Sequence, residues 1–349
     1  MNRNVGLLPA LCACLLTMVI AGCGRPPDQP GVLIGGQRLA VVDMHLHTGT
    51  WEAMTPQFQE RVSERVPRAL RWVMPYVMPY TLGGKAILRE IDNAGISAGG
   101  VFALYSPHTT GTATNDFVAG EIALNPQRLF GFASLRVDQW NTNGPEQLAK
   151  LEAALKGPGN FVGVKLAHAH QQFRFDDERY YPIYEIAGRL HKPVYLHTGT
   201  SPNPGTRTEP PYADPAYLEE AIRRYPDTIF ILGHTGYDSY GKTLRFTDAA
   251  IRLAVAYPNA YLEPGALGAE RAEGVLDDFL ARVRVAGVIP KMIYGSDGPQ
   301  QPGYVKSHLG RFVAGMQKAG YSVEEMRAIL SGNFSRVFGL PPFTVEGSK

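Results

Sequence analysis

The feature that most constrains the fold of this chain is a short apolar run that recurs along nearly its whole length. Each run is typical of a β-strand and ends at, or just before, a polar residue or a glycine. After a long first gap the runs recur about every 30 residues, which is the length of one strand–helix unit. Eight runs are present, at residues 39–45, 99–105, 129–135, 161–167, 193–197, 228–234, 260–265 and 291–297.

Helical patterns fill the gaps between these runs. In the segment "GKAILREIDNAG", for example, Ile87 and Ile91 share one face, and Gly95 marks the end of the helix. Eight alternations, with strands that are apolar on both faces, predict a closed parallel sheet inside a ring of helices, the (β/α)8 TIM barrel of the α/β class. A doubly wound open sheet is the alternative, although that fold rarely needs eight evenly spaced units.

The barrel is expected to occupy residues 38–341, with a short tail at 342–349. The long first gap, residues 48–83, is expected to be an insertion after the first strand, where it would act as a lid or substrate wall or as a packing elaboration. The segment "GNFSRVFGL" predicts extra helical structure that closes the barrel at the carboxyl end. The aromatic residues of the insertion are expected either to bury it or to line an apolar substrate wall: Trp72, Tyr76 and Tyr80.

The amino terminus is typical of an export signal, with Arg3, an apolar stretch of 18 residues and small residues before Cys23. We expect residues 1–22 to be a lipoprotein signal peptide and Cys23 to be lipidated, because "IAGC" resembles a bacterial lipobox. Residues 23–37, rich in proline and glycine, are expected to form a flexible tether. A plain secretory signal or a transmembrane anchor is the alternative, although 18 residues are marginal for spanning. The expected location is the periplasmic side of a bacterial outer membrane.

Composition excludes several other classes of protein. The net charge of +2, without a clustered basic stripe, argues against nucleic-acid binding. All three cysteines lie in the first 23 residues, so disulfides and thiolate chemistry are excluded from the folded body. The sequence contains no nucleotide-binding glycine fingerprint and no serine-hydrolase elbow.

Polar residues gather at the carboxyl ends of the apolar runs, which form a single face in a barrel. His45 and His47 lie two residues apart on the first run and should project the same way. On its own, this pair fits hydrogen-bonded loop histidines as well as metal ligands. His197, His234 and Asp297 end three other runs. Together these nitrogen donors and the carboxylate predict a site for Zn²⁺ or a similar ion.

With these motifs, the sequence resembles the amidohydrolase superfamily, specifically its amidohydrolase-related branch. The resemblance covers nearly the whole mature chain, from "VDMHLH" through "PVYLHTGT", "FILGHTG" and "YGSDGP" to "GNFSRVFGL". The resemblance implies a TIM barrel whose metal is bound by His45, His47, His197 and Asp297. It also implies that His234 orients or polarises the substrate or the attacking water.

Lys165, near the end of the fourth run, raises the question of a second metal ion. In two-metal members of the superfamily a lysine at this place is carboxylated and bridges the ions, which first requires a pKa lowered by burial. We expect one ion, and two if Lys165 is carboxylated. An ion pair of Lys165 with Glu263 is the alternative. His308, in a late helix, is expected to be exposed. Further candidates for the substrate pocket lie after other runs: His108, His168, His170 and Glu263.

A bound divalent ion lowers the pKa of a water molecule toward neutrality. With Asp297 as ligand and general base and His234 beside the developing charge, the sequence predicts hydrolysis of an amide, ester or lactone bond in a small molecule. Asp43, two residues before His45, is expected on the same face, as an orienting partner or as buried structure. The same branch contains decarboxylases of aromatic or unsaturated acids, which are the first alternative. A non-catalytic periplasmic metal-binding lipoprotein is the second, and homo-oligomerisation stays open.

Overall fold

The computed structural model describes residues 27, 29–64, 66–269 and 273–345. The expected signal peptide, residues 1–22, and the expected lipidation site Cys23 lie outside the described residues. Among the described residues, no helix combines the length and the apolar character needed to cross a bilayer.

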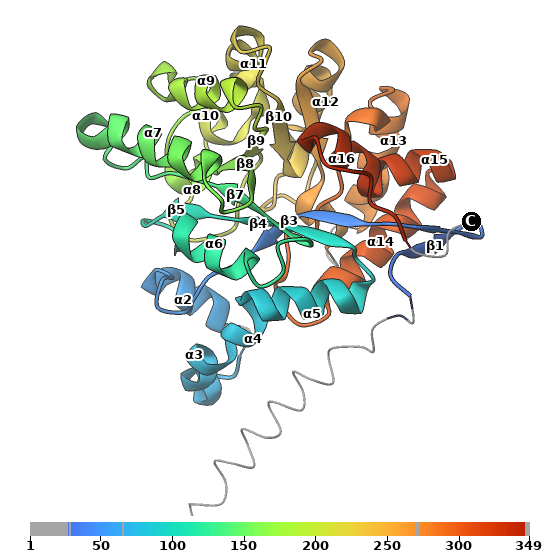
Figure 1. The fold of residues 1–349 in the computed structure, drawn as a ribbon, viewed down its shortest axis with the longest axis horizontal. Coiled ribbons are helices and arrows are strands. Elements are labelled where there is room, and N and C mark those ends of the chain that lie inside the picture. The colour runs from blue at the N-terminus through green and yellow to red at the C-terminus, as the bar shows by residue number, and fades with distance from the viewer. Residues whose placement is uncertain (1–26, 28, 65, 270–272, 346–349) are drawn as a thin grey trace, which may run out of the picture.

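Seven parallel strands form one curled sheet at the centre of the molecule, and helices surround it (Figure 1). The order of the strands across the sheet is β11-β10-β9-β8-β7-β4-β3, so each strand lies beside its predecessor in this set. Their bounds are β3 Val42–His47, β4 Ala98–Phe102, β7 Leu129–Ala133, β8 Phe161–Leu166, β9 Val194–His197, β10 Phe230–Gly233 and β11 Ala260–Glu263.

The eighth apolar run closes the gap between β11 and β3 without being a regular strand. Ile293 donates from its backbone nitrogen to Leu262 of β11 at 2.9 Å, and Met44 of β3 donates to the carbonyl of Tyr294 at 3.1 Å. The expectation of eight strands is therefore corrected to seven strands and one extended segment, residues 292–298. These hydrogen bonds join the segment to β11 on one side and to β3 on the other, so the hydrogen-bonded ring is continuous around the centre.

The helices that follow the strands are amphipathic and pack against the outside of the sheet, as their apolar spacing predicts. Those around the barrel are α5 Gly84–Ala94, α6 Asn115–Ile122, α7 Trp140–Lys156, α8 His168–Gln171, α9 Pro182–Arg189, α10 Pro210–Ala213, α11 Glu219–Arg224, α12 Thr247–Ala256, α13 Glu273–Val285 and α14 Tyr304–Lys318. Short 3-10 turns complete the connections: η2 Glu178–Tyr180, η3 Pro215–Leu218, η4 His234–Gly236, η5 Gly265–Gly268 and η6 Ile289–Lys291. A small hairpin, β5 Leu104–Ser106 and β6 Gly111–Ala113, follows β4.

Two segments extend this pattern. Residues 48–83 hold α2 Pro56–Ser63, η1 Arg68–Val73, α3 Met74–Val77 and α4 Pro79–Leu82. After α14 come α15 Val323–Arg327, the π-helical turn η7 Ala328–Gly332 and α16 Asn333–Phe338. The ring of Phe334 in α16 lies 6.2 Å from that of Phe130, and Phe338 lies 5.3 Å from Phe132, so α16 packs against the apolar interior of the sheet.

The end of the expected tether is structured. Residues 32–34 form β1 (Val32–Ile34), which pairs antiparallel with β2 (Gln37–Leu39). This part of segment 23–37 therefore differs from the flexible tether that we expected. The physical reason is the positive φ of Gly35 and Gly36, 56° and 79°, which allows a tight turn between the strands.

Candidate metal centre

A bulge in β3 brings both of its histidines into the barrel. Between Asp43 and Leu46, β3 has one residue more than its partner β4. Met44 belongs to the apolar cluster inside the sheet, whereas Leu46 belongs to the outer cluster. The bulge lets His45 point to the interior directly after Met44. From there the faces alternate again, with Leu46 outside and His47 inside. The sequence correctly predicted that the two imidazoles face the same way, because alternation holds from His45 to His47. It did not predict the bulge that turns both of them toward the interior.

Because of the same bulge, Asp43 does not share the face of His45 and is not positioned beside its ring. Its Oδ1 accepts hydrogen bonds from the backbone nitrogens of His45, at 3.1 Å, and Ser296, at 2.9 Å. We expected Asp43 either to orient a ligand imidazole or to be a buried structural residue. The structure supports the structural role. Asp43 ties β3 to the extended segment that carries Asp297. Burial raises the pKa of Asp43 to about 6, although both hydrogen bonds oppose the shift.

Three donor atoms form a compact triangle at the carboxyl end of the sheet. The Nε2 atoms of His45 and His47 lie 3.1 Å apart. Asp297 Oδ1 lies 3.2 Å from the first of these atoms and 3.0 Å from the second. Ligand atoms at 2.0–2.1 Å from a shared ion are separated by roughly 3 Å, so the spacing fits one divalent cation.

Hydrogen bonds between neutral rings and a carboxylate do not account for this triangle. A neutral imidazole carries a single proton, so a nitrogen that accepts from its neighbour has none to give to the carboxylate. The three contacts among His45, His47 and Asp297 therefore cannot all be hydrogen bonds between neutral rings and a carboxylate. A shared cation would satisfy all three atoms, and two imidazoles with one carboxylate are donors that Zn²⁺ and Mn²⁺ both accept.

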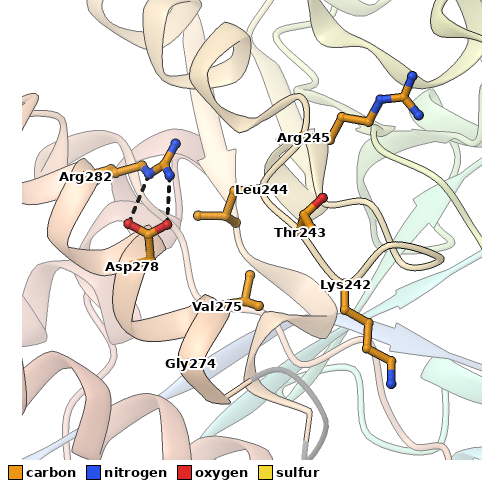
Figure 2. A pocket seen from close by; sticks show the side chains of 8 residues that line it. All are labelled: Lys242, Thr243, Leu244, Arg245, Gly274, Val275, Asp278 and Arg282. Carbon is orange, nitrogen blue, oxygen red and sulfur yellow. Dashed lines mark hydrogen bonds and ion pairs between the residues drawn. The ribbon is translucent and has the colours of Figure 1, made fainter.

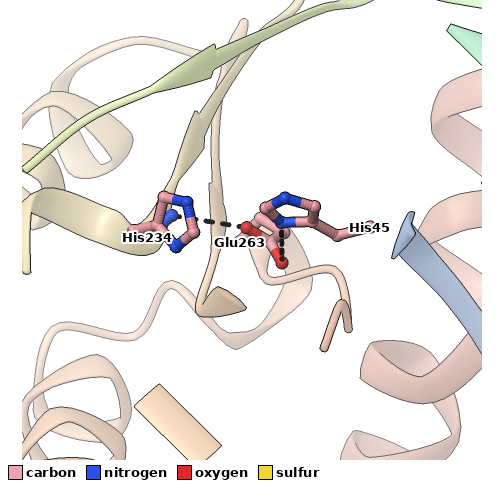
Figure 3. A group of neighbouring side chains, drawn as sticks. All are labelled: His45, His234 and Glu263. Atoms are coloured by element: carbon pink, nitrogen blue, oxygen red, sulfur yellow. Dashed lines mark hydrogen bonds and ion pairs between the residues drawn. The ribbon is translucent and has the colours of Figure 1, made fainter. Parts of the chain in front are cut away.

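Glu263 and Tyr195 hold the other side of the His45 ring. His45 Nδ1 lies 3.3 Å from Glu263 Oε1 and 3.0 Å from the hydroxyl of Tyr195, which itself donates to Glu263 Oε2 at 2.9 Å. Figure 3 shows Glu263 between His45 and His234. A carboxylate on Nδ1 keeps the proton there and leaves the Nε2 lone pair free for a metal.

Glu263 also has little capacity left to bind an ion itself. It accepts from the backbone nitrogens of His234, at 3.3 Å, and Gly265, at 2.9 Å, in addition to Tyr195. His45, His234 and Glu263 do form a second set of donor atoms within 4.8 Å of one another. Because its oxygens already accept these donors, we interpret Glu263 as the carboxylate that orients His45. The first triangle is therefore the group better suited to hold an ion.

The charge states of the triangle follow from its neighbours. Burial alone would raise the pKa of Asp297, but the charge and hydrogen bond of His45 and the hydrogen bond of His47 hold it well below its usual range. Burial alone would lower the pKa of His45, but the carboxylates of Glu263 and Asp297 outweigh it and raise that pKa. The Asp297 backbone has a positive φ of 63°, a conformation that non-glycine residues adopt rarely and that recurs at functional sites.

A row of neutral imidazoles borders the triangle. The ring centroid of His197 lies 4.4 Å from that of His234 and 4.8 Å from that of His170. Burial lowers the pKa of His234 to about 4 and that of His170 to about 3, and it lowers the pKa of His197 well below its usual value. These three residues are therefore uncharged near neutral pH.

His197 lies beside the triangle rather than in it. Among the described residues, the groups of donor atoms that all lie within 4.8 Å of one another do not include His197. Its Nε2 is buried without a hydrogen-bond partner, which is costly unless an ion or a substrate atom satisfies it. The chemistry of His197 thus suits a metal ligand, while its position is looser than that of His45, His47 and Asp297.

Lys165 is buried under aromatic rings rather than paired with Glu263. Its Nζ lies 4.0 Å from the centre of the Tyr195 ring and 4.4 Å from that of Phe102. Burial lowers the pKa of Lys165 to about 7, against the opposing charges of Asp297 and Glu263. A substantial fraction of this lysine is therefore neutral at pH 7, as carboxylation would require.

Two expected pocket residues lie away from the triangle. His168 packs in the core, with its ring 3.9 Å from Phe173, and its Nε2 lies 3.4 Å from the hydroxyl of Tyr184. The side chain of His108 is 60% exposed and lies 3.5 Å from Asp138. The β8 strand ends before His168, so helix α8 directs that residue into the helix layer, and the hairpin after β4 directs His108 to solvent.

His308 is buried rather than exposed, contrary to our expectation. Its Nε2 donates to the carbonyl of Gly265 at 2.7 Å, and its Nδ1 lies 3.0 Å from the hydroxyl of Tyr294. Burial lowers the pKa of His308 to about 4. The reason is that α14 packs its His308 face against the sheet-side turn η5.

The hollows on the surface do not coincide with this cluster. One pocket of about 460 Å³ lies between the loop at Lys242–Arg245 and the start of α13 (Figure 2). Asp278 and Arg282 form an ion pair of 2.8 Å across its wall. Another, of about 430 Å³, lies between α6 and α7. Neither pocket contains a residue of the triangle.

The fold and the triangle together define the class of protein. The chain belongs to the amidohydrolase family, because the family's sequence model, described as Amidohydrolase, matches residues 42–340. The family expected from the sequence is thus confirmed. A curated relative, protein fluG of Emericella nidulans, is 36% identical over 75 residues, which make up 22% of this chain and 8% of that protein. The chain thus spans only a small part of the length of that relative.

Solved structures share the fold at low sequence identity. An uncharacterised TIM-barrel protein of Bordetella bronchiseptica matches with a TM-score of 0.65 and 19% identity, over 86% of this chain and 99% of its own. A protein of Acinetobacter baumannii, described as a probable 2-pyrone-4,6-dicarboxylic acid hydrolase, has a TM-score of 0.58 and 16% identity. The match covers 86% of this chain and 100% of that protein's chain. A dihydroxybenzoic acid decarboxylase of Polaromonas with bound manganese has a TM-score of 0.59 and 18% identity. The match covers 86% of this chain and 97% of the decarboxylase chain.

Tyr195 is the residue of the site that the sequence analysis missed. It lies two residues before His197 on β9, so strand alternation places both side chains inside the barrel. A tyrosine within an otherwise aliphatic buried strand is the signal that could have identified it, because a buried hydroxyl needs a partner.

Proposed function

We propose that the protein is a metal-dependent hydrolase that cleaves an amide, ester or lactone bond in a small molecule. The observation that carries the proposal is the triangle of His45, His47 and Asp297, together with the carboxylate of Glu263 on the far side of His45. We propose His197 as a further ligand, because its buried Nε2 has no other partner. We expect one ion, with a second only if Lys165 is carboxylated.

A bound divalent ion supplies Lewis acidity and lowers the pKa of water in this site. Asp297 is ionised and 20% exposed, so it can accept the proton of an attacking water. The backbone nitrogen of Ala266 lies 3.4 Å from His234 Nδ1 and donates to it, which places the ring proton on Nε2. A neutral His234 can therefore donate a hydrogen bond to a carbonyl oxygen as negative charge develops there.

A second candidate function is decarboxylation of an aromatic or unsaturated carboxylic acid. The decarboxylase of Polaromonas matches over 86% of this chain and 97% of its own, and its structure contains manganese. In this chemistry Asp297 and the neutral His234 would handle protons while the cation holds the substrate. The protein of A. baumannii described as a probable hydrolase matches with a similar TM-score, although most of the similar solved structures are decarboxylases.

A substrate panel separates the two functions. The purified chain, loaded in parallel with Zn²⁺ and with Mn²⁺, is assayed against lactones, esters, amides and hydroxylated benzoic acids. Hydrolysis of a member of the first three groups, lost in the Asp297→Asn variant, supports the proposal. Release of carbon dioxide from the aromatic acids without hydrolysis would replace it with the decarboxylase. Metal binding without any turnover would favour a non-catalytic metal-binding protein. The same panel tests our expectation of zinc.

We also propose that the protein is exported and held at the membrane by a lipid on Cys23. The sequence supports this proposal, because an apolar stretch is followed by "IAGC". Metabolic labelling with a tagged fatty acid tests it. Labelling of the wild-type chain and loss of the label in Cys23→Ser support the anchor, whereas an unlabelled wild-type chain contradicts it.

A further inference from the structure

The helical run of residues 68–82 presents an aromatic face to solvent. Trp72, Tyr76 and Tyr80 are 50%, 71% and 49% exposed. They are spaced four residues apart in η1, α3 and α4, which follow one another with helical backbone at Val73 and Met78. Residues four apart on a helix lie on one side, so the three rings form a single stripe, the aromatic stripe. The structure thus contradicts the expectation that these rings bury the segment.

The aromatic stripe is not the most buried side of this run. The opposite side of the same run supplies the packing, through the buried side chains of Val73, Met74 and Met78. Figure 1 shows α3 and α4 at the rim of the molecule, away from the sheet. Three large aromatic side chains that each leave about half or more of their surface exposed point to an interaction surface.

Cations lie at both ends of the aromatic stripe. Arg68, one turn before Trp72, is exposed. Arg89, also exposed, donates from Nη2 to the carbonyl of Tyr80 at 3.2 Å. Arginines beside tryptophan and tyrosine are the composition of helices that lie in the interface of an anionic bilayer.

We propose that the aromatic stripe docks on the interfacial region of a lipid bilayer. Its three rings expose roughly 350 Å², counting about 200 Å² for a whole aromatic side chain. A stable contact between two copies of the chain needs about 800 Å² on each partner. The aromatic stripe is therefore small for a dimer, whereas rings that insert singly at the level of lipid headgroups have no such minimum.

The chain between Cys23 and the fold is short. Cys23 precedes Val32 of β1 by nine residues, which span at most about 30 Å when extended. A lipid on Cys23 would hold the barrel within reach of the bilayer. The inference does not require that lipid, because the aromatic stripe and its arginines are properties of the folded body.

Tryptophan fluorescence tests the docking directly. The full chain is mixed with vesicles of phosphatidylcholine and phosphatidylglycerol that carry bromine on the upper acyl chain, a short-range quencher. Trp72 is one of three tryptophans, at positions 51, 72 and 140, so residues 1–50 contribute no signal. We expect brominated vesicles to lower the emission, and we expect Trp72→Phe to abolish that loss. The matched control Trp140→Phe, on α7, should retain it.

Several results would overturn the inference. Emission that brominated lipid does not change, or a loss that survives Trp72→Phe, shows that the aromatic stripe does not meet lipid. Protection of Trp72 from acrylamide without quenching by brominated lipid indicates contact with a second copy instead. A double variant, Tyr76→Ser with Tyr80→Ser, should weaken the quenching of Trp72 while leaving metal content unchanged. Equal quenching would also count against the bilayer.

Discussion

At the scale of residues, the site depends on how one imidazole is shared between two carboxylates. His45 faces Asp297 through Nε2 and Glu263 through Nδ1. Glu263 can fix the tautomer of His45 only because Tyr195 and backbone nitrogens hold the carboxylate in place. The metal site is thus set by Glu263 and Tyr195 as much as by the residues that would touch the ion.

Glu263→Gln and Tyr195→Phe should each weaken metal binding by about 10–100-fold, as substitutions behind metal-bound histidines do. The reason is that His45 loses the partner that holds its proton on Nδ1. Metal affinity measured by competition with a chelator checks this expectation. Tyr240→Phe, at a residue that is 58% exposed, is the matched control and should bind as tightly as wild type. Unchanged affinity in both site variants would contradict the assigned role.

The ligand types could be predicted from the sequence, because histidines and an aspartate at strand ends have few other uses. The direction of each side chain could not. A single extra residue in β3 separates Asp43 from the face of His45, and no composition or spacing signals a bulge. His308 shows the same limit, because a histidine among polar residues of a helix gives no sign that its partners, Gly265 and Tyr294, lie behind it.

At the scale of elements, the extended segment 292–298 completes both the barrel and the site. It lacks regular strand pairing, yet Gly295 lets it pass close to the side chains of Glu263 and His45. A Cβ at Gly295 would collide with Glu263 Oε1, because the carboxylate is already held by Gly265 and Tyr195. The apolar pattern correctly placed this segment in the barrel, but it could not show that pairing here is irregular.

Gly295→Ala should lower metal occupancy, because the added methyl group displaces Glu263 from His45. Metal content after purification in a fixed concentration of zinc measures the effect. The control is Gly310→Ala, at an exposed position in α14 where a Cβ meets nothing within 4 Å. That change should keep the metal and add about 0.5–1 kcal/mol of stability, as alanine replaces glycine in a helix. Equal metal content in the two variants would argue against the close approach.

At the scale of the whole molecule, burial of neutral histidines couples the barrel to pH. His308 is neutral in the folded state because burial lowers its pKa from 6.5 to about 4. The unfolded chain binds a proton at this residue below about pH 6.5. The contribution of His308 to stability is thus present above pH 6.5 and is lost as the pH falls toward 4, by up to about 3 kcal/mol.

His308→Gln should therefore flatten the dependence of unfolding free energy on pH between 6.5 and 4. The expected difference in slope from wild type approaches one proton, about 1.4 kcal/mol per pH unit. Urea unfolding at several pH values measures it. His191→Asn, at an exposed histidine, should keep the wild-type slope. If His308→Gln also keeps that slope, the residue is not a buried neutral group in the folded protein.

The central claim is that His45, His47 and Asp297 hold one divalent cation at the carboxyl end of the barrel. Metal analysis of the purified chain by mass spectrometry, beside the Asp297→Asn variant, tests it most directly. We predict one ion per wild-type chain and a large loss of metal in the variant, with the fold retained by circular dichroism. A wild-type chain that binds no divalent ion when one is supplied, or a variant that keeps its ion, would contradict the account.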